Sequence, residues 1–74
     1  MKVKIEYCVI WNYYPRAAGL AEKINDALKV NTELIESRGG AFEIFLDDQK
    51  IYSKLQTGDF PDEQEIIQLL KEKV

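Results

Sequence analysis

The sequence predicts a single mixed α/β domain with the element order β-α-β-β-β-α, and three patterns in its 74 residues support this prediction. Apolar and polar residues alternate over residues 2–9 and again over residues 41–47 and 50–55, as they do in strands with one buried face. Between these segments, apolar residues recur at helical spacing over residues 17–28. A chain of this length has room for one domain, residues 1–74.

The first strand is predicted over residues 2–9, because Val3, Ile5, Tyr7 and Val9 share one face. Cys8 then falls on the opposite, polar face at the end of the strand, so we expect an exposed sulfur and not a core cysteine. Pro15 suits the first turn of a helix, where its missing N–H is no loss. The apolar spacing that follows predicts a helix from Pro15 to about Lys29.

Three further strands and a helix are predicted in the second half. Residues 32–37 form a short strand, which the run Arg38-Gly39-Gly40 ends. Residues 41–47 and 50–55 form a hairpin around a tight turn at Asp47-Asp48-Gln49. Pro61 opens the last helix, and acidic residues near its start suit the helix dipole. The apolar stripe of that helix is Ile66, Ile67, Leu70 and Val74.

This order is that of a thioredoxin-like fold, with a four-stranded mixed sheet. A strand-helix-strand unit is expected to be parallel with a right-handed crossover, whereas the hairpin adds antiparallel strands. The link between residues 37 and 41 is too short for a helix, so both helices are expected on one face. The other face is then either a solvated surface or a binding surface. We expect it to carry Glu6, Glu43, Phe45, Tyr52 and Lys54.

The composition limits the kinds of catalysis and metal binding that this chain can perform. Histidine is absent and Cys8 is the only cysteine, which excludes His-dependent catalysis, imidazole or all-Cys metal sites, and an internal disulfide. The net charge is −3 and the basic residues are scattered, so nucleic acid is not an expected partner. The chain contains no long apolar run and its first residues do not resemble a signal peptide. We therefore expect a cytoplasmic protein that does not bind membranes, as a monomer or weak dimer.

Cys8 is the candidate reactive group because of its place between the first strand and the first helix. In a thioredoxin-like fold the redox motif lies at this junction. Backbone N–H groups and the dipole at a helix start stabilise a thiolate and lower the pKa of a cysteine.

Several segments in the same order resemble the selenoprotein W-like (Rdx) family. The run Tyr7-Cys8 through Pro15-Arg16-Ala17 resembles the strand ending in Tyr-Cys, the Cys-x-x-Cys or Cys-x-x-selenocysteine motif, and the start of the helix. The second half agrees through Gly40-Ala41-Phe42-Glu43-Ile44, Lys50-Ile51-Tyr52-Ser53-Lys54 and Gly58-Asp59-Phe60-Pro61.

The resemblance implies a thioredoxin-like fold and thiol-based redox activity, with no bound cofactor and with glutathione as a candidate co-substrate. Cys8 matches the first, nucleophilic cysteine, but Trp11 stands where the second cysteine is expected. Trp11 cannot resolve a mixed disulfide, so Cys8 would depend on an outside thiol, such as glutathione or a protein partner. Any enzymatic activity is at most that of a monothiol oxidoreductase. The alternative is a non-catalytic interaction domain that has lost the dithiol centre.

The remaining candidates each have a structural alternative. Trp11, Tyr13 and Tyr14 form either an aromatic rim at the thiol or part of the core, and Tyr14 is the most suited to the core. Arg16 either adds positive charge near Cys8 or is a solvated helix residue. Gly39 and Gly40 either contact a peptide or glutathione through their backbone, or only form a turn. The acidic cluster Asp59, Asp62, Glu63 and Glu65 is either a site for carboxylate catalysis or a cation, or the negative start of the last helix, and we favour the helix start.

Overall fold

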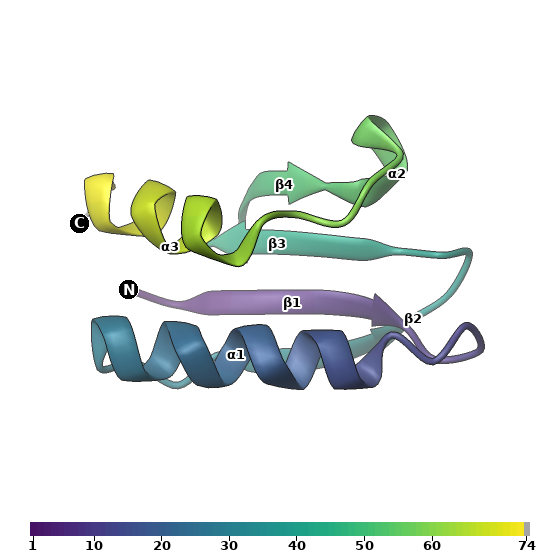
Figure 1. Ribbon diagram of the computed structural model, residues 1–74, viewed down its shortest axis with the longest axis horizontal. Helices are drawn as coiled ribbons and strands as arrows, with labels where there is room; N and C mark the ends of the chain where they lie inside the picture. The colour runs from purple at the N-terminus through teal and green to yellow at the C-terminus, as the bar shows by residue number, and fades with distance from the viewer. Residues whose placement is uncertain (74) are drawn as a thin grey trace.

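Four strands form one mixed sheet in the order β2-β1-β3-β4 in a computed structural model that describes residues 1–73 (Figure 1). The strands are β1 (Val3–Cys8), β2 (Glu33–Ser37), β3 (Phe42–Leu46) and β4 (Gln49–Ser53). Strand β1 pairs in parallel with β2 and antiparallel with β3, and β3 and β4 form the expected hairpin. Asp47 and Asp48 have φ angles of 50° and 70°, which suit a tight hairpin turn.

Helix α1 (Tyr14–Leu28) and helix α3 (Glu63–Glu72) lie on the same face of this sheet, as the sequence predicts (Figure 1). Their apolar stripes and the matching face of β1 and β3 make one core. The buried members of that core are Val3, Ile5, Tyr7, Ala17, Leu20, Ala21, Ile24, Phe42, Ile44, Leu46, Ile66, Ile67 and Leu70. No helix within residues 1–73 is both long and apolar enough to cross a bilayer.

The ends of the two long helices follow local rules. Pro15 lies in the first turn of α1, and Lys29 ends that helix with a left-handed φ of 57°. Helix α3 begins later than the predicted start at Pro61, because Asp62 is its N-cap and accepts the N–H groups of Gln64 and Glu65. Asp62, Glu63 and Glu65 form the start of the helix, as expected, whereas Asp59 lies in the loop before it. Val74, which was assigned to its apolar stripe, lies outside the described residues.

A short helix that the sequence analysis did not predict follows β4. The strand expected over residues 50–55 ends at Ser53, and α2 (Lys54–Thr57) follows it directly. The Ser53 side chain accepts the N–H of Gln56 at the start of this turn, and Gly58 ends it with a φ of 79°. The serine N-cap thus starts the helix where the strand ends, and the left-handed glycine ends the helix after one turn.

The face of the sheet opposite the helices differs from the prediction because of an irregularity in the hairpin. The register shifts between Ile44 and Phe45, so that Ile44 pairs with Tyr52 whereas Phe45 pairs with Lys50. One extra residue in β4 reverses the alternation of everything after it. Tyr52 therefore packs against the core and not on the open face.

Two other residues assigned to that open face are also placed differently. Ser53 lies opposite Glu43, and the Glu43 side chain, expected in solvent, is buried with only 2% of its surface exposed. Lys54, expected in a strand, is the first residue of α2. Glu6 and Phe45 remain partly exposed on this face.

Candidate functional site

Cys8 is the last residue of β1, and a tight turn separates it from α1. The strand thus ends one residue before its predicted end, and Val9, expected on the core face, is exposed in this turn. The N–H of Asn12 donates to the carbonyl of Val9 at 2.9 Å, and the N–H of Tyr13 donates to the carbonyl of Cys8 at 3.0 Å. Asn12 has a φ of 59°, a left-handed conformation that asparagine tolerates better than most residues. The turn therefore folds back on the end of the strand before the helix begins.

This turn encloses the sulfur, so the prediction of an exposed thiol is wrong. Cys8 has 0% of its surface exposed, although it is not a member of the main apolar core. The N–H of Trp11 donates to the Cys8 Sγ at 3.4 Å. The alternation along the strand correctly predicts that Cys8 lies on the face opposite the core. It does not predict that the following turn covers that face.

The surroundings of the sulfur favour the thiolate. Burial by itself raises the pKa of the Cys8 thiol, because a charge is disfavoured away from water. The backbone N–H groups of Trp11, Gly40 and Ile10 act in the opposite direction. The Lys54 ammonium adds to their effect, and the pKa of Cys8 lies below its ordinary value. Cys8 is thus both enclosed and electrostatically activated.

Gly40 lies beside this sulfur, and it forms with Gly39 a turn that only glycine adopts easily. Their φ angles are 72° and 77°, in the left-handed region. The ring of Trp11 lies against Gly40, where an added Cβ would come within 2.9 Å of Trp11 Cζ3. Gly39 has open space around its Cα. Both glycines therefore form a turn, and Gly40 also allows the close approach of the Trp11 ring. Contact of this turn with a peptide or glutathione stays a prediction.

An aromatic cluster surrounds the ammonium of Lys54 beside the thiol. Lys54 Nζ lies 5.9 Å from the ring of Trp11, and 5.3 Å from the rings of both Tyr13 and Phe60. These distances are within the range of cation–π attraction. Trp11 has 60% of its surface exposed and Tyr13 packs partly against the core. Tyr14, which seemed most suited to the core, is instead 52% exposed.

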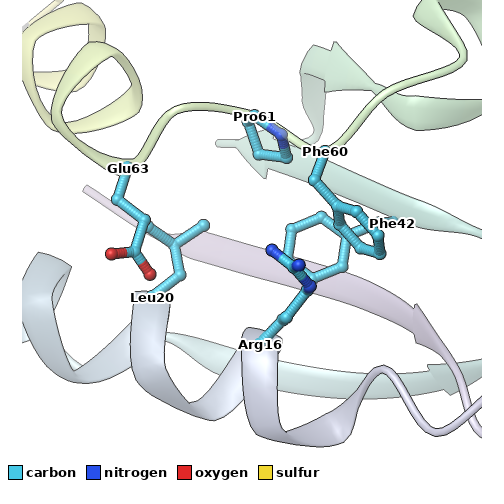
Figure 2. Close-up of a pocket in the computed structure, with 6 residues that line it drawn as sticks. All are labelled: Arg16, Leu20, Phe42, Phe60, Pro61 and Glu63. Carbon is cyan, nitrogen blue, oxygen red and sulfur yellow. The ribbon is translucent and has the colours of Figure 1, made fainter.

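Arg16 occupies a different place from the one expected. Its guanidinium carbon lies 4.1 Å from the centre of the Phe60 ring, on a small hollow between α1 and the start of α3 (Figure 2). The residues that line this hollow are Arg16, Leu20, Phe42, Phe60, Pro61 and Glu63. The cation that lowers the pKa of Cys8 is Lys54, which the sequence analysis did not choose as a site residue.

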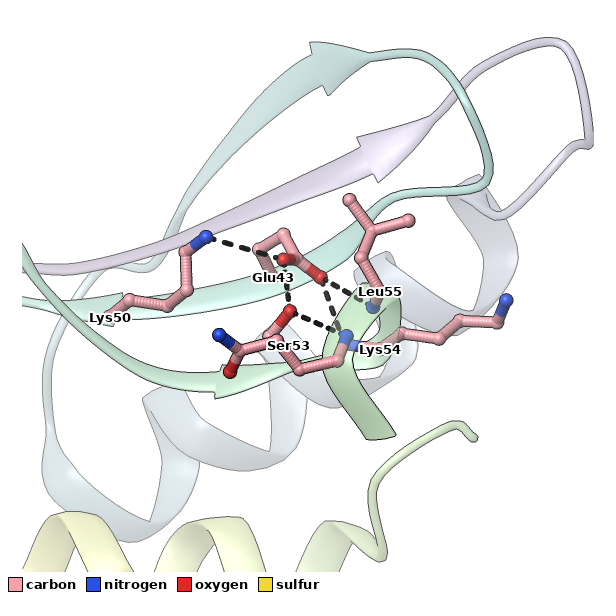
Figure 3. A network of polar contacts seen from close by, with 6 residues as sticks. Glu43, Lys50, Ser53, Lys54 and Leu55 are labelled. Atoms are coloured by element: carbon pink, nitrogen blue, oxygen red, sulfur yellow. Dashed lines mark hydrogen bonds and ion pairs between the residues drawn. The ribbon is translucent and has the colours of Figure 1, made fainter. Parts of the chain in front are cut away.

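The buried carboxylate of Glu43 lies next to the backbone of Lys54. Glu43 Oε1 accepts the hydroxyl of Ser53, and Glu43 Oε2 accepts the backbone N–H of Lys54 at 2.9 Å (Figure 3). The N–H of Leu55 points to the same Oε2 at 3.4 Å, and Lys50 Nζ lies 3.4 Å from Oε1. Burial raises the pKa of Glu43, but the Ser53, Leu55 and Lys50 contacts outweigh it and lower the pKa of this carboxyl.

The structure thus brings together Cys8, Trp11, Tyr13 and Gly40, with Gly39 in the same turn, and it places Arg16 over Phe60. Sequence reasoning missed Lys54 and Glu43 as parts of this region. A signal for both was present, because Glu43 and Ser53-Lys54 stand inside the segments that resemble the Rdx family. They were read as strand residues, since alternation alone does not reveal a bulge or a short helix.

Comparison with known proteins agrees with this geometry. A solved structure of a selenoprotein W-related protein from Vibrio cholerae has a TM-score of 0.90 and 27% identity, over 96% of this chain and 92% of that chain. A protein of known structure from Bordetella parapertussis shares the fold, with a TM-score of 0.93 and 21% identity over 99% of this chain and 96% of that chain. No curated protein matches the sequence.

The family model supplies the decisive match, because it spans almost the whole chain. The model described as the Rdx family matches residues 2–72, which include every element of the sheet and all three helices. The mixed sheet and the position of Cys8 at the end of β1 agree with the thioredoxin-like plan. The chain therefore belongs to the selenoprotein W-like Rdx family.

Proposed function

We propose that this protein is a thiol-dependent redox protein that acts through Cys8 alone. Membership of the Rdx family supports a redox-related role. The observation that carries the proposal is the hydrogen bond from the Trp11 N–H to the Cys8 sulfur, in a turn where further N–H groups and Lys54 favour the thiolate. A thiolate is the nucleophile of disulfide exchange, so lowering the pKa increases its population near neutral pH.

The proposed reaction is the transfer of a glutathionyl group between thiols. The Cys8 thiolate attacks the glutathione sulfur of a protein–glutathione mixed disulfide, a new S–S bond forms, and the protein thiolate leaves. A glutathione thiolate then attacks the same glutathione sulfur, which releases Cys8 as a thiolate and forms glutathione disulfide. Two electrons pass from glutathione to the original disulfide, and no second cysteine of this chain is needed.

The side chains around the thiol are the proposed binding residues. Trp11, Tyr13 and the Gly39-Gly40 turn provide apolar surface and backbone groups beside the sulfur. Arg16, at the neighbouring hollow, forms no ion pair within residues 1–73, so its guanidinium is available for a carboxylate. A cytoplasmic location, which the sequence favours, would supply reduced glutathione as the co-substrate.

Reaction requires the turn over the thiol to open. Cys8 has no exposed surface, so a disulfide cannot reach the sulfur in the closed arrangement. The two hydrogen bonds within the turn must break or rearrange first. The expected behaviour is therefore a thiol with a low pKa but a slow rate of alkylation.

The test is the pH dependence of Cys8 alkylation in the native protein, beside denatured protein at the same temperature. We expect the native midpoint to lie below the denatured one, and a mass increase of one glutathionyl group after incubation with glutathione disulfide. Cys8→Ser is the control for both measurements. Equal midpoints in native and denatured protein would reject the proposal.

A second candidate, a non-catalytic docking role for a protein partner, is favoured by the exposure of apolar side chains in the same turn. Ile10 is 82% exposed and Trp11 is 60% exposed, and Leu55 of α2 is 60% exposed. This role predicts that Trp11→Ala weakens partner capture whereas Cys8→Ser leaves it intact. Capture that depends entirely on Cys8 would instead support the redox function.

A further inference from the structure

The position of Lys54 depends on how α2 begins. The helix comprises Lys54–Thr57 and starts directly at the end of β4, so the backbone of its first residue sets the direction of the Lys54 side chain. That side chain reaches the rings of Trp11, Tyr13 and Phe60, at 5.9, 5.3 and 5.3 Å from Nζ. The Lys54 ammonium therefore lies at the aromatic cluster beside Cys8 and not in open solvent.

Glu43 determines that start from inside the protein. Its Oε2 accepts the N–H groups of Lys54 and Leu55, two of the N–H groups at the start of α2 that have no partner within the helix. Its Oε1 accepts the hydroxyl of Ser53 (Figure 3). The Ser53 oxygen in turn accepts the N–H of Gln56. The Glu43 carboxylate thus accepts hydrogen bonds both from the N-cap residue Ser53, at the end of β4, and from the first two N–H groups of α2.

We propose that Glu43 is a positioning residue for the Cys8 site, because it fixes the first turn of α2 and thereby keeps the Lys54 ammonium over the aromatic cluster of Trp11, Tyr13 and Phe60. This inference rests on the proposed function, in which Cys8 acts as a thiolate. Glu43 itself acts through Lys54, because its carboxylate contacts Lys50, Ser53 and the N–H groups of α2 and not the sulfur of Cys8.

The direction in which the pKa of Cys8 changes when Glu43 is replaced distinguishes a positioning role of Glu43 from a direct effect of its charge. Glu43 is negatively charged, so a direct effect of its charge on the thiolate would be unfavourable, and neutralising it would lower the pKa of Cys8. Positioning acts in the opposite sense. If the first turn of α2 loses its acceptor, Lys54 is no longer fixed near the thiolate, and the pKa of Cys8 rises.

The experiment measures the midpoint of Cys8 alkylation in wild type, Glu43→Ala, Glu43→Gln, Lys54→Met and the double variant Glu43→Ala/Lys54→Met. Circular dichroism confirms that each variant is folded. Glu43→Ala should raise the midpoint by as much as Lys54→Met does, and the double variant should match Lys54→Met. Glu43→Gln should stay close to wild type, because its amide oxygen still accepts the N–H groups of α2.

Each other outcome has a defined meaning. The positioning role is overturned if folded Glu43→Ala keeps or lowers the midpoint, if Lys54→Met leaves it unchanged, or if the effects of the two substitutions add fully. If Glu43→Ala does not fold, Ser53→Ala replaces it, since it removes one partner of Glu43 and the N-cap of α2 together. A native wild-type midpoint equal to that of denatured protein would instead reject the proposed function, before any variant is compared.

Discussion

The ring of Trp11 occupies the space where a side chain of residue 40 would begin. A Cβ on Gly40 would lie 2.9 Å from Trp11 Cζ3 and 3.2 Å from Cε3, closer than such atoms normally approach. Trp11 is the only tryptophan, and its backbone N–H contacts the Cys8 sulfur. The glycine turn, the indole ring and the thiol therefore form one connected unit.

Gly40→Ala should displace the Trp11 ring, whereas Gly39→Ala should not. Both residues have positive φ angles, so each substitution is expected to destabilise the protein by about 1–2 kcal/mol in denaturant unfolding. Open space surrounds Gly39, so its variant keeps the ring in place. The fluorescence spectrum of Trp11 should change in Gly40→Ala alone. An identical spectral change in both variants would contradict the packing described here.

The pKa of Cys8 links stability to pH. The thiol has a lower pKa in the folded protein than its ordinary value, so the unfolded chain binds more protons between the two values. The free energy of unfolding should therefore rise, relative to Cys8→Ser, as pH increases through the native pKa toward about 8.5. Chemical unfolding of both proteins between about pH 6 and pH 9 provides the measurement. A difference that stays constant over this range would indicate a thiol that is not activated.

Glu43 should contribute to resistance to acid. Its pKa is lowered in the folded state, so its contribution is present above about pH 4.3 and is lost as pH falls through the lower native value. Wild type should therefore lose its stability advantage over Glu43→Gln in acid. At neutral pH, Glu43→Ala should cost about 2 kcal/mol, because buried N–H groups lose their acceptor. Glu22→Gln, an exposed carboxylate on α1, is the control and should show neither effect.

Arg16 should affect stability slightly and the thiol hardly at all. Its guanidinium lies on the Phe60 ring at 4.1 Å, and a cation–π contact at an exposed site contributes about 0.5–1 kcal/mol. Arg16→Met should therefore lower the free energy of unfolding by about this amount, while the midpoint of Cys8 alkylation stays at the wild-type value. A clear rise of that midpoint would show that Arg16, and not only Lys54, acts on the thiolate.

Apart from the short helix α2, the element order and the two-layer architecture were predictable because they depend on patterns that repeat along the chain. The alternation at Val3, Ile5 and Tyr7 and the helical spacing around Leu20 and Ile24 lead directly to the observed core. The hairpin turn at Asp47-Asp48 was predictable for a similar reason, since these residues tolerate the left-handed backbone that a tight turn requires.

The candidate site was less predictable because it depends on local irregularities of the backbone and on the directions of individual side chains. One extra residue in β4 turned Tyr52 inward and placed Ser53 opposite Glu43, and no alternation pattern reveals such a bulge in advance. The roles of Lys54 and Arg16 were interchanged for another reason. Both have long side chains, and closeness in sequence to Cys8 does not determine which of them reaches the thiol.

The enclosed position of Cys8 also sets which molecules it can meet. A sulfur with no exposed surface encounters peroxide only as often as the turn over residues 9–12 opens, however activated it is. The oxidation ladder from sulfenic to sulfonic acid requires repeated encounters of this kind. A protein partner bound at the exposed turn would keep this turn open for longer and so allow thiol–disulfide exchange. If Cys8 has the proposed function, the closed turn also protects its thiolate from irreversible oxidation until the turn opens.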